Sequence, residues 1–216
     1  MVLQFPRLKT LVIFLFVIGH RPTLVRMADI TPGSTMTGNI MQELKDSGYG
    51  VTLAIFVENW TKFPLIHPFV YFEFGFGFKE NTPVTIQPGT KEVFPVRKTS
   101  GLMAGTSGVA SWVVYKADRR LVIMWSIPYV FHPHRNWMAV GLTPTGFTGV
   151  PWGKVWYRQM FYGYSNLDMK FTRQTTNAIH KDAQFTITAS MTESYHSNFT
   201  IIFKPVRSED LAPGLH

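Results

Sequence analysis

Short apolar runs separated by turn residues dominate the chain from residue 51 onward. Within these runs, apolar and β-branched residues alternate by twos or follow one another directly, which is typical of strands. Gly, Pro and Asn mark many of the breaks between the runs. We expect strands at 51–57, 69–78, 108–115, 121–126, 137–142, 168–173, 183–191 and 198–203. This pattern predicts a mainly β fold, a β-sandwich flanked by two short α-helices.

Two stretches carry helical spacing instead. In residues 34–47, apolar side chains recur on one face, and Gly48 and Gly50 then end the helix and leave a flexible hinge. Residues 153–162 predict a second short helix. The apolar stripe of the first helix consists of Met36, Ile40 and Leu44 at four-residue spacing, with Met41 beside it.

Four phenylalanines in the run 69–78 are spaced by two. Phe72, Phe74, Phe76 and Phe78 would therefore share one face of a single strand. We interpret that face as sandwich core or a glycine-flexed edge, in preference to a lipid-facing surface.

The first residues have the order of a secretory signal. Arg7 and Lys9 precede the apolar run 11–18, which is shorter than the roughly 20 residues of a membrane-spanning helix. We expect a signal peptide at 1–19 and a secreted protein. The alternative is an upstream extension, with the functional start at Met27.

Charge and composition limit the kinds of site and of binding partner that the chain could have. The 216 residues include no cysteine, which excludes disulfides, thiolate metal sites and a cysteine nucleophile. The net charge of +8 favours anionic partners such as acidic glycans or anionic lipid surfaces. Nucleic acid is not expected, because no run of five or more Lys and Arg occurs.

The chain offers no convincing catalytic or metal-binding constellation. Ser126 lacks the Gly-x-Ser-x-Gly turn of a serine hydrolase, and paired carboxylates of glycosidase type are not evident. His132 and His134 resemble a two-imidazole metal clip, but no third ligand is near them in sequence, so a solvated or interfacial loop is the better interpretation. We expect no enzyme activity, no cofactor and no metal site.

Aromatic side chains gather in two later regions. Residues 125–129 are Trp-Ser-Ile-Pro-Tyr, 136–141 are Asn-Trp-Met-Ala-Val-Gly, and 156–162 are Trp-Tyr-Arg-Gln-Met-Phe-Tyr. Trp and Tyr favour the lipid–water boundary, and their ring faces attract cationic headgroups. The alternative is that half of the rings on the second helix simply bury it against a sheet.

These regions resemble those of the actinoporin-like pore-forming cytolysins, in particular the divergent echotoxin- and conoporin-like branches. The resemblance covers roughly residues 34–204 and is most specific over 97–162. The matching segments are 57–60, the turn at 87–93, the strand entry at 105–109 and the segment 125–132. The resemblance implies a sandwich that binds phospholipid headgroups, oligomerises in the membrane and inserts its N-terminal helix.

In that family a phosphocholine pocket lies between the segment matching 125–132 and the second helix. The resemblance therefore implies phosphocholine lipids as partners, with sphingomyelin among the candidates. The pocket positions that carry over are Ser107, Ser126, Pro128, Trp137, Tyr157, Phe161 and Tyr162. Phe161 keeps the ring of a family tyrosine and lacks its hydroxyl.

Four positions depart from the family pattern. A Trp-Tyr pair of the exposed loop aligns with Pro133 and His134, and an Arg-Ser pair near the pocket aligns with Glu73 and Phe74. A glutamate there would attract a choline ammonium and repel the phosphate. We therefore expect the lipid specificity to have moved away from sphingomyelin.

Together these features divide the chain into a signal peptide (1–19), an N-terminal segment with an amphipathic helix (20–50), a membrane-binding sandwich (51–205) and a tail (206–216). We interpret the protein as a pore former that acts at the target-cell membrane. The alternative is a non-lytic lipid- or glycan-binding module, since fungal lectins share a related sandwich. The length of the predicted helix favours this alternative. Residues 34–47 reach about 21 Å as a helix, which is short of the roughly 30 Å of hydrocarbon in a bilayer.

The signal peptide is testable by expressing the chain in a secretory cell. We expect a shortened protein in the medium, with its first residue soon after Gly19, because the basic and apolar segments of residues 7–18 are arranged in the order that signal peptidase substrates share. N-terminal sequencing measures this. A full-length chain retained inside the cell would contradict it.

Overall fold

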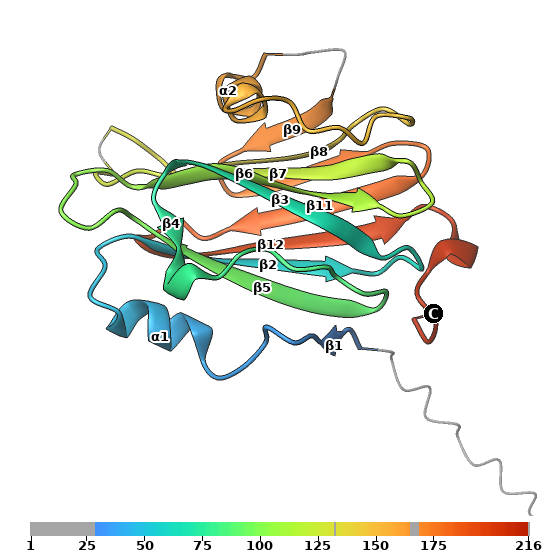
Figure 1. Cartoon of the computed structure of the whole chain (residues 1–216), viewed down its shortest axis with the longest axis horizontal. Coiled ribbons are helices and arrows are strands. Elements are labelled where there is room, and N and C mark those ends of the chain that lie inside the picture. Colours follow the sequence, from blue (N-terminus) through green and yellow to red (C-terminus); the bar gives the residue numbers. More distant parts are fainter. Residues whose placement is uncertain (1–28, 132, 165–168, 216) are drawn as a thin grey trace, which may run out of the picture.

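The computed structural model describes residues 29–131, 133–164 and 169–215. Two sheets pack face to face, and one helix lies on the outside of each (Figure 1). The expected mainly β sandwich with two short helices is confirmed. The expected signal peptide at 1–19, the alternative start at Met27 and the imidazole of His132 lie outside the described residues.

The larger sheet has seven strands in the order β1-β5-β2-β12-β11-β10, and β4 pairs with β5 beside this path. The β12–β2 and β1–β5 pairs are parallel and the others antiparallel. Strand β2 is buried on both faces, which explains its continuous apolar run. The strands are β1 (Thr31–Pro32), β2 (Thr52–Asn59), β4 (Phe76–Gly77), β5 (Thr90–Arg97), β10 (Asn177–Lys181), β11 (Phe185–Met191) and β12 (His196–Pro205).

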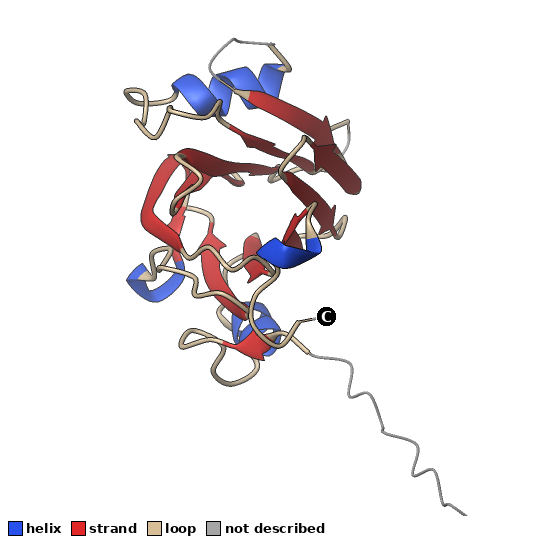
Figure 2. Ribbon diagram, turned by 90° about the vertical axis from the view of Figure 1, so that its right-hand side faces the viewer, coloured by secondary structure: helices blue, strands red, loops and turns tan. Residues whose placement is uncertain are grey.

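The smaller sheet is antiparallel throughout, in the order β3-β6-β7-β8-β9. Helix α2 (Val155–Tyr162) covers its outer face, as the turned view in Figure 2 shows. The strands are β3 (Leu65–Phe74), β6 (Thr106–Val114), β7 (Arg119–Ile127), β8 (Trp137–Leu142) and β9 (Lys170–Gln174). Among the residues described, no helix is both long and apolar enough to cross a membrane.

Large aromatic side chains fill the space between the two sheets. Trp112 and Trp125 are fully buried there. The ring centroid of Phe94 on β5 lies 6.0 Å from that of Trp112 and 6.1 Å from that of Trp125. Neighbouring residues on a strand point to opposite faces, so an inward Trp125 directs Ser126 outward, toward α2.

The expectation that the four phenylalanines share one face of a strand is wrong. Gly75 has φ +86, and a Cβ there would lie 2.3 Å from the carbonyl oxygen of Arg97. At this glycine the chain leaves the smaller sheet and joins the larger one as β4. Phe72 therefore packs against Trp125, Phe78 is buried next to α1, and Phe74 and Phe76 are each 52% exposed.

Helix α1 (Ile40–Asp46) is half as long as predicted. The residues before it are held by a distant carboxylate: Glu92 on β5 accepts hydrogen bonds from the backbone N–H groups of Ser34 (2.9 Å) and Thr35 (2.8 Å). Asn39 then caps the helix by accepting from Gln42 N–H. The sequence pattern could not reveal Glu92, which is 58 residues away from Ser34.

The predicted apolar stripe of α1 does face the sheet. Leu44 is fully buried in a small cluster with Ala54, Phe78 and Val93, separate from the main core. The partly buried side chains that pack around this cluster include Met36, Ile40 and Met41. Burying this stripe stabilises the docked position of the helix.

Arg120 is a buried cation in the smaller sheet. Its Nε donates to Ser111 Oγ at 3.0 Å, and its Nη2 donates to the carbonyl oxygen of His67 at 2.7 Å. Nη1 donates to the carbonyl oxygen of Thr148, which ties the loop before α2 to the sheet. Burial lowers the pKa of Arg120 to about 10, so the group keeps its charge at neutral pH.

We expect Arg120→Met to lower the free energy of unfolding by about 3 kcal/mol, because several buried oxygens lose their only charged donor. Arg207→Met is the matched control, since Arg207 is exposed at the end of the sandwich, and its effect should stay within about 0.5 kcal/mol. Urea denaturation followed by tryptophan fluorescence measures both. Equal stability of the two variants would contradict the role given to Arg120.

Candidate functional site

A row of side chains crosses one end of the smaller sheet on the face that α2 covers. Ser107 on β6 pairs with Ser126 on β7, and Ser126 pairs with Trp137 on β8. The same face carries Glu73 of β3, which lies in one hollow with Ser107 and Ser126, and Tyr71, whose hydroxyl donates to Glu73 Oε2 at 2.7 Å. Adjacent strands thus align these polar and aromatic groups side by side.

Helix α2 forms the roof over this row. Tyr157 and Phe161 are four residues apart, so their rings stack on the same side of the helix, with centroids 5.5 Å apart. Phe161 contacts Tyr162 edge to face. Gly163 ends the helix with φ +75, a left-handed conformation that suits glycine. Trp156 and Tyr157 are buried against the sheet, as the alternative interpretation of the aromatic segment expects, while Tyr162 is 58% exposed.

The row and the roof enclose two adjoining hollows. The first, of about 410 Å³, is lined by six of the seven predicted pocket residues: Ser107, Ser126, Pro128, Tyr157, Phe161 and Tyr162. The second, of about 250 Å³, contains Trp137 and shares Ser126, Pro128 and Phe161 with the first. The structure therefore brings all seven residues to one place, and the space available suits a small polar headgroup.

The floor of the first hollow holds a hydroxyl without a partner. Ser107 is 4% exposed, and its Oγ makes no hydrogen bond within the part of the chain that the structure describes. The Tyr157 phenol lies near Ser107 but outside hydrogen-bond geometry: burial raises the pKa of Tyr157, and the nearby hydroxyls of Ser107 and Ser126 act in the opposite direction. A buried hydroxyl that is left unpaired costs free energy, so this floor favours a ligand that can bond to it.

Two arginines near the second hollow were not singled out from the sequence. Arg135 lines that hollow and is exposed. Arg173 on β9 lies over Trp137, with its guanidinium carbon 3.4 Å from the centroid of the indole ring. Desolvation lowers the pKa of Arg173. Neither position has a local motif; only the pairing of β9 with β8 brings Arg173 to Trp137.

The loop between β7 and β8 is fastened to the opposite sheet. Asn136 is fully buried, and its amide donates to the carbonyl oxygen of Thr192 (2.9 Å) and to Ser197 Oγ (3.0 Å). This fixes the start of β8, and with it Trp137. The described residues include no cluster of three His, Asp or Glu side chains that could hold a metal ion.

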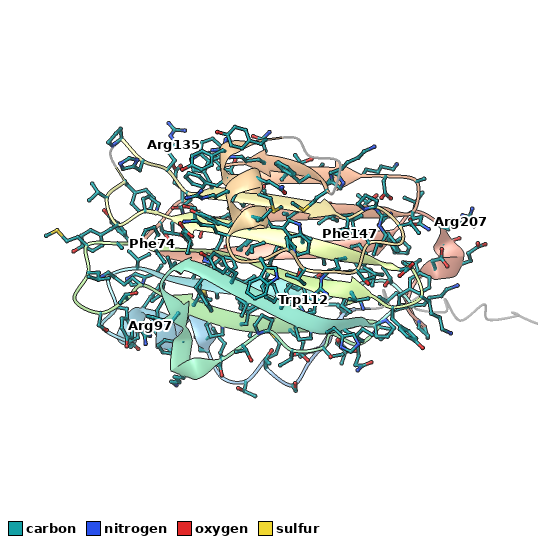
Figure 3. The ribbon with its side chains drawn as sticks, turned by 45° about the horizontal axis from the view of Figure 1, so that its top comes forward. Phe74, Arg97, Trp112, Arg135, Phe147 and Arg207 are labelled. Carbon is teal, nitrogen blue, oxygen red and sulfur yellow. The ribbon has the colours of Figure 1, made fainter. Side chains whose placement is uncertain are left out.

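Exposed apolar side chains surround the mouth of the first hollow. Phe74 and Met103 line it and are 52% and 87% exposed. Figure 3 shows Phe74 and Arg135 toward one end of the molecule and Arg207 toward the other. Further exposed apolar or aromatic residues in the segments next to these are Phe76, Leu102, Tyr129, Val130 and Tyr164. Exposed apolar surface beside a pocket is typical of an interaction site.

Comparison with known proteins identifies close relatives among mollusc toxins. Conoporin-Cn1 of Conus consors is 37% identical, over 98% of this chain and 92% of its own. Tereporin-Ca1 of Terebra anilis is 40% identical, over 82% of this chain and 97% of its own. Echotoxin-2 of Monoplex parthenopeus is 34% identical, over 78% of this chain and 62% of its own.

No family model matches the chain. Among solved structures, the lipid binding protein Nakanori superposes with a TM-score of 0.62 at 17% identity, covering 76% of this chain and 77% of the other. At that level of identity the likeness shows a shared fold.

The aromatic residues of α2 should differ in how much they contribute to the stability of the fold. We expect Tyr157→Ala to lower the free energy of unfolding by about 3 kcal/mol, because Tyr157 is 7% exposed and stacked on Phe161. Tyr162→Ala should change it by about 0.5 kcal/mol or less, since Tyr162 faces solvent. Thermal and urea unfolding measure both; similar losses in the two variants would contradict the burial described here.

Proposed function

The chain belongs to the actinoporin-like pore-forming toxins of molluscs, and we propose that it permeabilises target-cell membranes after binding phosphocholine headgroups in the hollow under α2. In this proposal the protein is secreted, collects on the membrane and oligomerises there. The observation that carries the headgroup proposal is the unpartnered Ser107 hydroxyl in a hollow roofed by aromatic rings. Aromatic faces attract the ammonium of such headgroups, at about 0.5–2 kcal/mol each.

The position of the hollow supports a membrane partner over a free metabolite. Its mouth opens among exposed apolar side chains, including Phe74 and Met103. Such side chains would enter the interfacial region of a bilayer at the same moment as a headgroup enters the hollow. The net charge of +8 adds attraction to anionic lipid surfaces, by about 1 kcal/mol for each basic residue near the surface.

We propose that pore formation uses the N-terminal segment, including α1. The contacts that hold this segment against the sandwich include the β1–β5 pairing, the Glu92 hydrogen bonds to residues 34 and 35, and the burial of Leu44. The helix has seven residues, about 10 Å by its rise, so insertion requires these contacts to break and the helix to lengthen. Gly48, with φ +77 and open space around it, suits a hinge for that movement.

The second candidate is a non-lytic lipid- or glycan-binding module. It is favoured by the same N-terminal geometry, because a segment that is fastened before a short helix, and whose helix buries Leu44, costs free energy to release. The two candidates share the headgroup hollow and differ in whether α1 leaves the sheet. An experiment that separates binding from leakage therefore decides between them.

We expect Ile40→Asp to abolish dye release from phosphatidylcholine vesicles, with and without sphingomyelin, and to leave vesicle binding intact. A charge at the centre of a bilayer costs about 3 kcal/mol or more, whereas Ile40 lies far in sequence from the hollow. Deleting the residues up to Ser47 should act in the same way. Co-sedimentation measures binding, and fluorophore dequenching measures leakage.

Gln42→Asp is the matched control, because it places the same charge on the exposed face of the same helix. It should retain leakage. Tight vesicle binding by the native protein without dye release at any of these compositions would reject the pore and leave the binding module. The headgroup proposal would fail if a folded Tyr162→Ala variant that also carries Ser126→Ala bound vesicles as well as the native protein.

A further inference from the structure

Charge is distributed unevenly along the row of side chains beneath α2. At the β3 side stands Glu73, and at the β8–β9 side stand Arg135 and Arg173. Strands lie about 4.8 Å apart, so the row from β3 to β8 spans about 14 Å. A zwitterionic headgroup, whose ammonium and phosphate are joined by two carbons, is shorter than this row. With its ammonium at the β3 side, its phosphate would lie where the two hollows meet at Ser126, toward Arg135.

The first hollow belongs to the negative end. Glu73 and His134 are the ionisable acid and imidazole that line it, and among the described residues no Lys or Arg does. None of the ion pairs found in the described ranges includes Glu73. Arg158 on the exposed side of α2 is near enough to act on the Tyr71 phenol but makes no such pair with Glu73. The hollow therefore suits a cation.

Two oxygens in this hollow can accept hydrogen bonds from such a cation. Glu73 Oε2 already accepts from Tyr71, and within the described part of the chain Oε1 accepts from no other group. Ser107 Oγ is the buried hydroxyl without a partner. A quaternary ammonium has no N–H group to offer these oxygens, whereas a primary ammonium has three. Hydrogen bonds between two charged groups are roughly twice as strong as neutral ones.

The second hollow supplies the complementary end. Arg135 and Trp137 line it, and it shares Ser126, Pro128 and Phe161 with the first, so the two form one continuous site. Arg173 covers a face of Trp137 with its own positive charge. That indole face is therefore closed to an ammonium, and the surroundings favour an anion such as a phosphate.

We propose that this site selects phospholipids whose headgroup ends in a primary ammonium, of the phosphoethanolamine kind, over those that end in a quaternary ammonium. The ammonium lies against Glu73 and Ser107 in the first hollow, and the phosphate lies where the two hollows meet, near Ser126 and toward Arg135. This inference rests on the proposed headgroup hollow. It ranks a primary-ammonium headgroup above the phosphocholine of the proposed function and names Glu73 as the residue that sets this ranking.

The test is competition by soluble headgroups, which avoids the packing differences between lipids. Vesicles containing equal parts of phosphatidylcholine and phosphatidylethanolamine are incubated with protein, and free phosphoethanolamine or phosphocholine is titrated in. For the native protein we expect phosphoethanolamine to displace it at about tenfold lower concentration, as one added charged hydrogen bond implies. In Glu73→Gln the two compounds should act at similar concentrations.

Control variants distinguish a loss of headgroup preference from a general effect of the substitution. Glu209→Gln removes an exposed carboxylate beside Arg207, toward the opposite end of the molecule, and should preserve the tenfold ratio (Figure 3). Ser107→Ala provides a second variant with a small change of volume, and it should also reduce the ratio. Circular dichroism and thermal unfolding show whether each variant is folded.

The inference is overturned if the native protein shows no preference, or if folded Glu73→Gln and Ser107→Ala both keep the native ratio. In those cases vesicle binding persists and the proposed function stands. Vesicle binding that neither compound reduces would remove the headgroup hollow and this inference together. Absence of vesicle binding at all would overturn the proposed function itself.

Discussion

The packing of aromatic rings between the two sheets is the constraint on which the rest of the structure depends. Trp112, Trp125 and Phe94 fill the interior, and their bulk determines which residues of β6 and β7 point inward. A shift of one residue in either strand would exchange the two faces. Ser107 and Ser126 therefore face α2 as a consequence of core packing, and the hollow beneath the helix depends on the same register.

The parts of the fold that sequence could predict are those where local pattern and tertiary environment agree. Helix α2 was expected within two residues of its observed start, because its aromatic spacing and Gly163 act in the same short stretch. Strand β5 was missed: it begins directly after turn residues 87–89 and contains Pro95. Strand β10 was missed as well, since it is short and has polar or charged residues at most of its positions.

The candidate site was predicted by resemblance, and its composition could not have been found by periodicity. Ser107, Ser126 and Trp137 come from three strands, and only sheet register makes them neighbours. Arg173 escaped notice for the same reason. The helix at residues 34–47 is longer in the prediction than in the structure because its apolar spacing is helical, while the carboxylate that holds residues 34 and 35 in a turn before the helix comes from Glu92 on another strand. A sequence pattern describes one segment of the chain at a time, whereas each of these features depends on a contact between two segments.

The crossing at Gly75 connects the two functional regions by a very short piece of chain. Glu73 borders the hollow beneath α2, and Lys79, six residues later, holds Glu43 of α1 at 2.9 Å. Six residues span at most about 20 Å even when fully extended. The glycine between them has no room for a side chain. One short stretch of chain therefore contributes both to the wall of the hollow and to the docking of the helix.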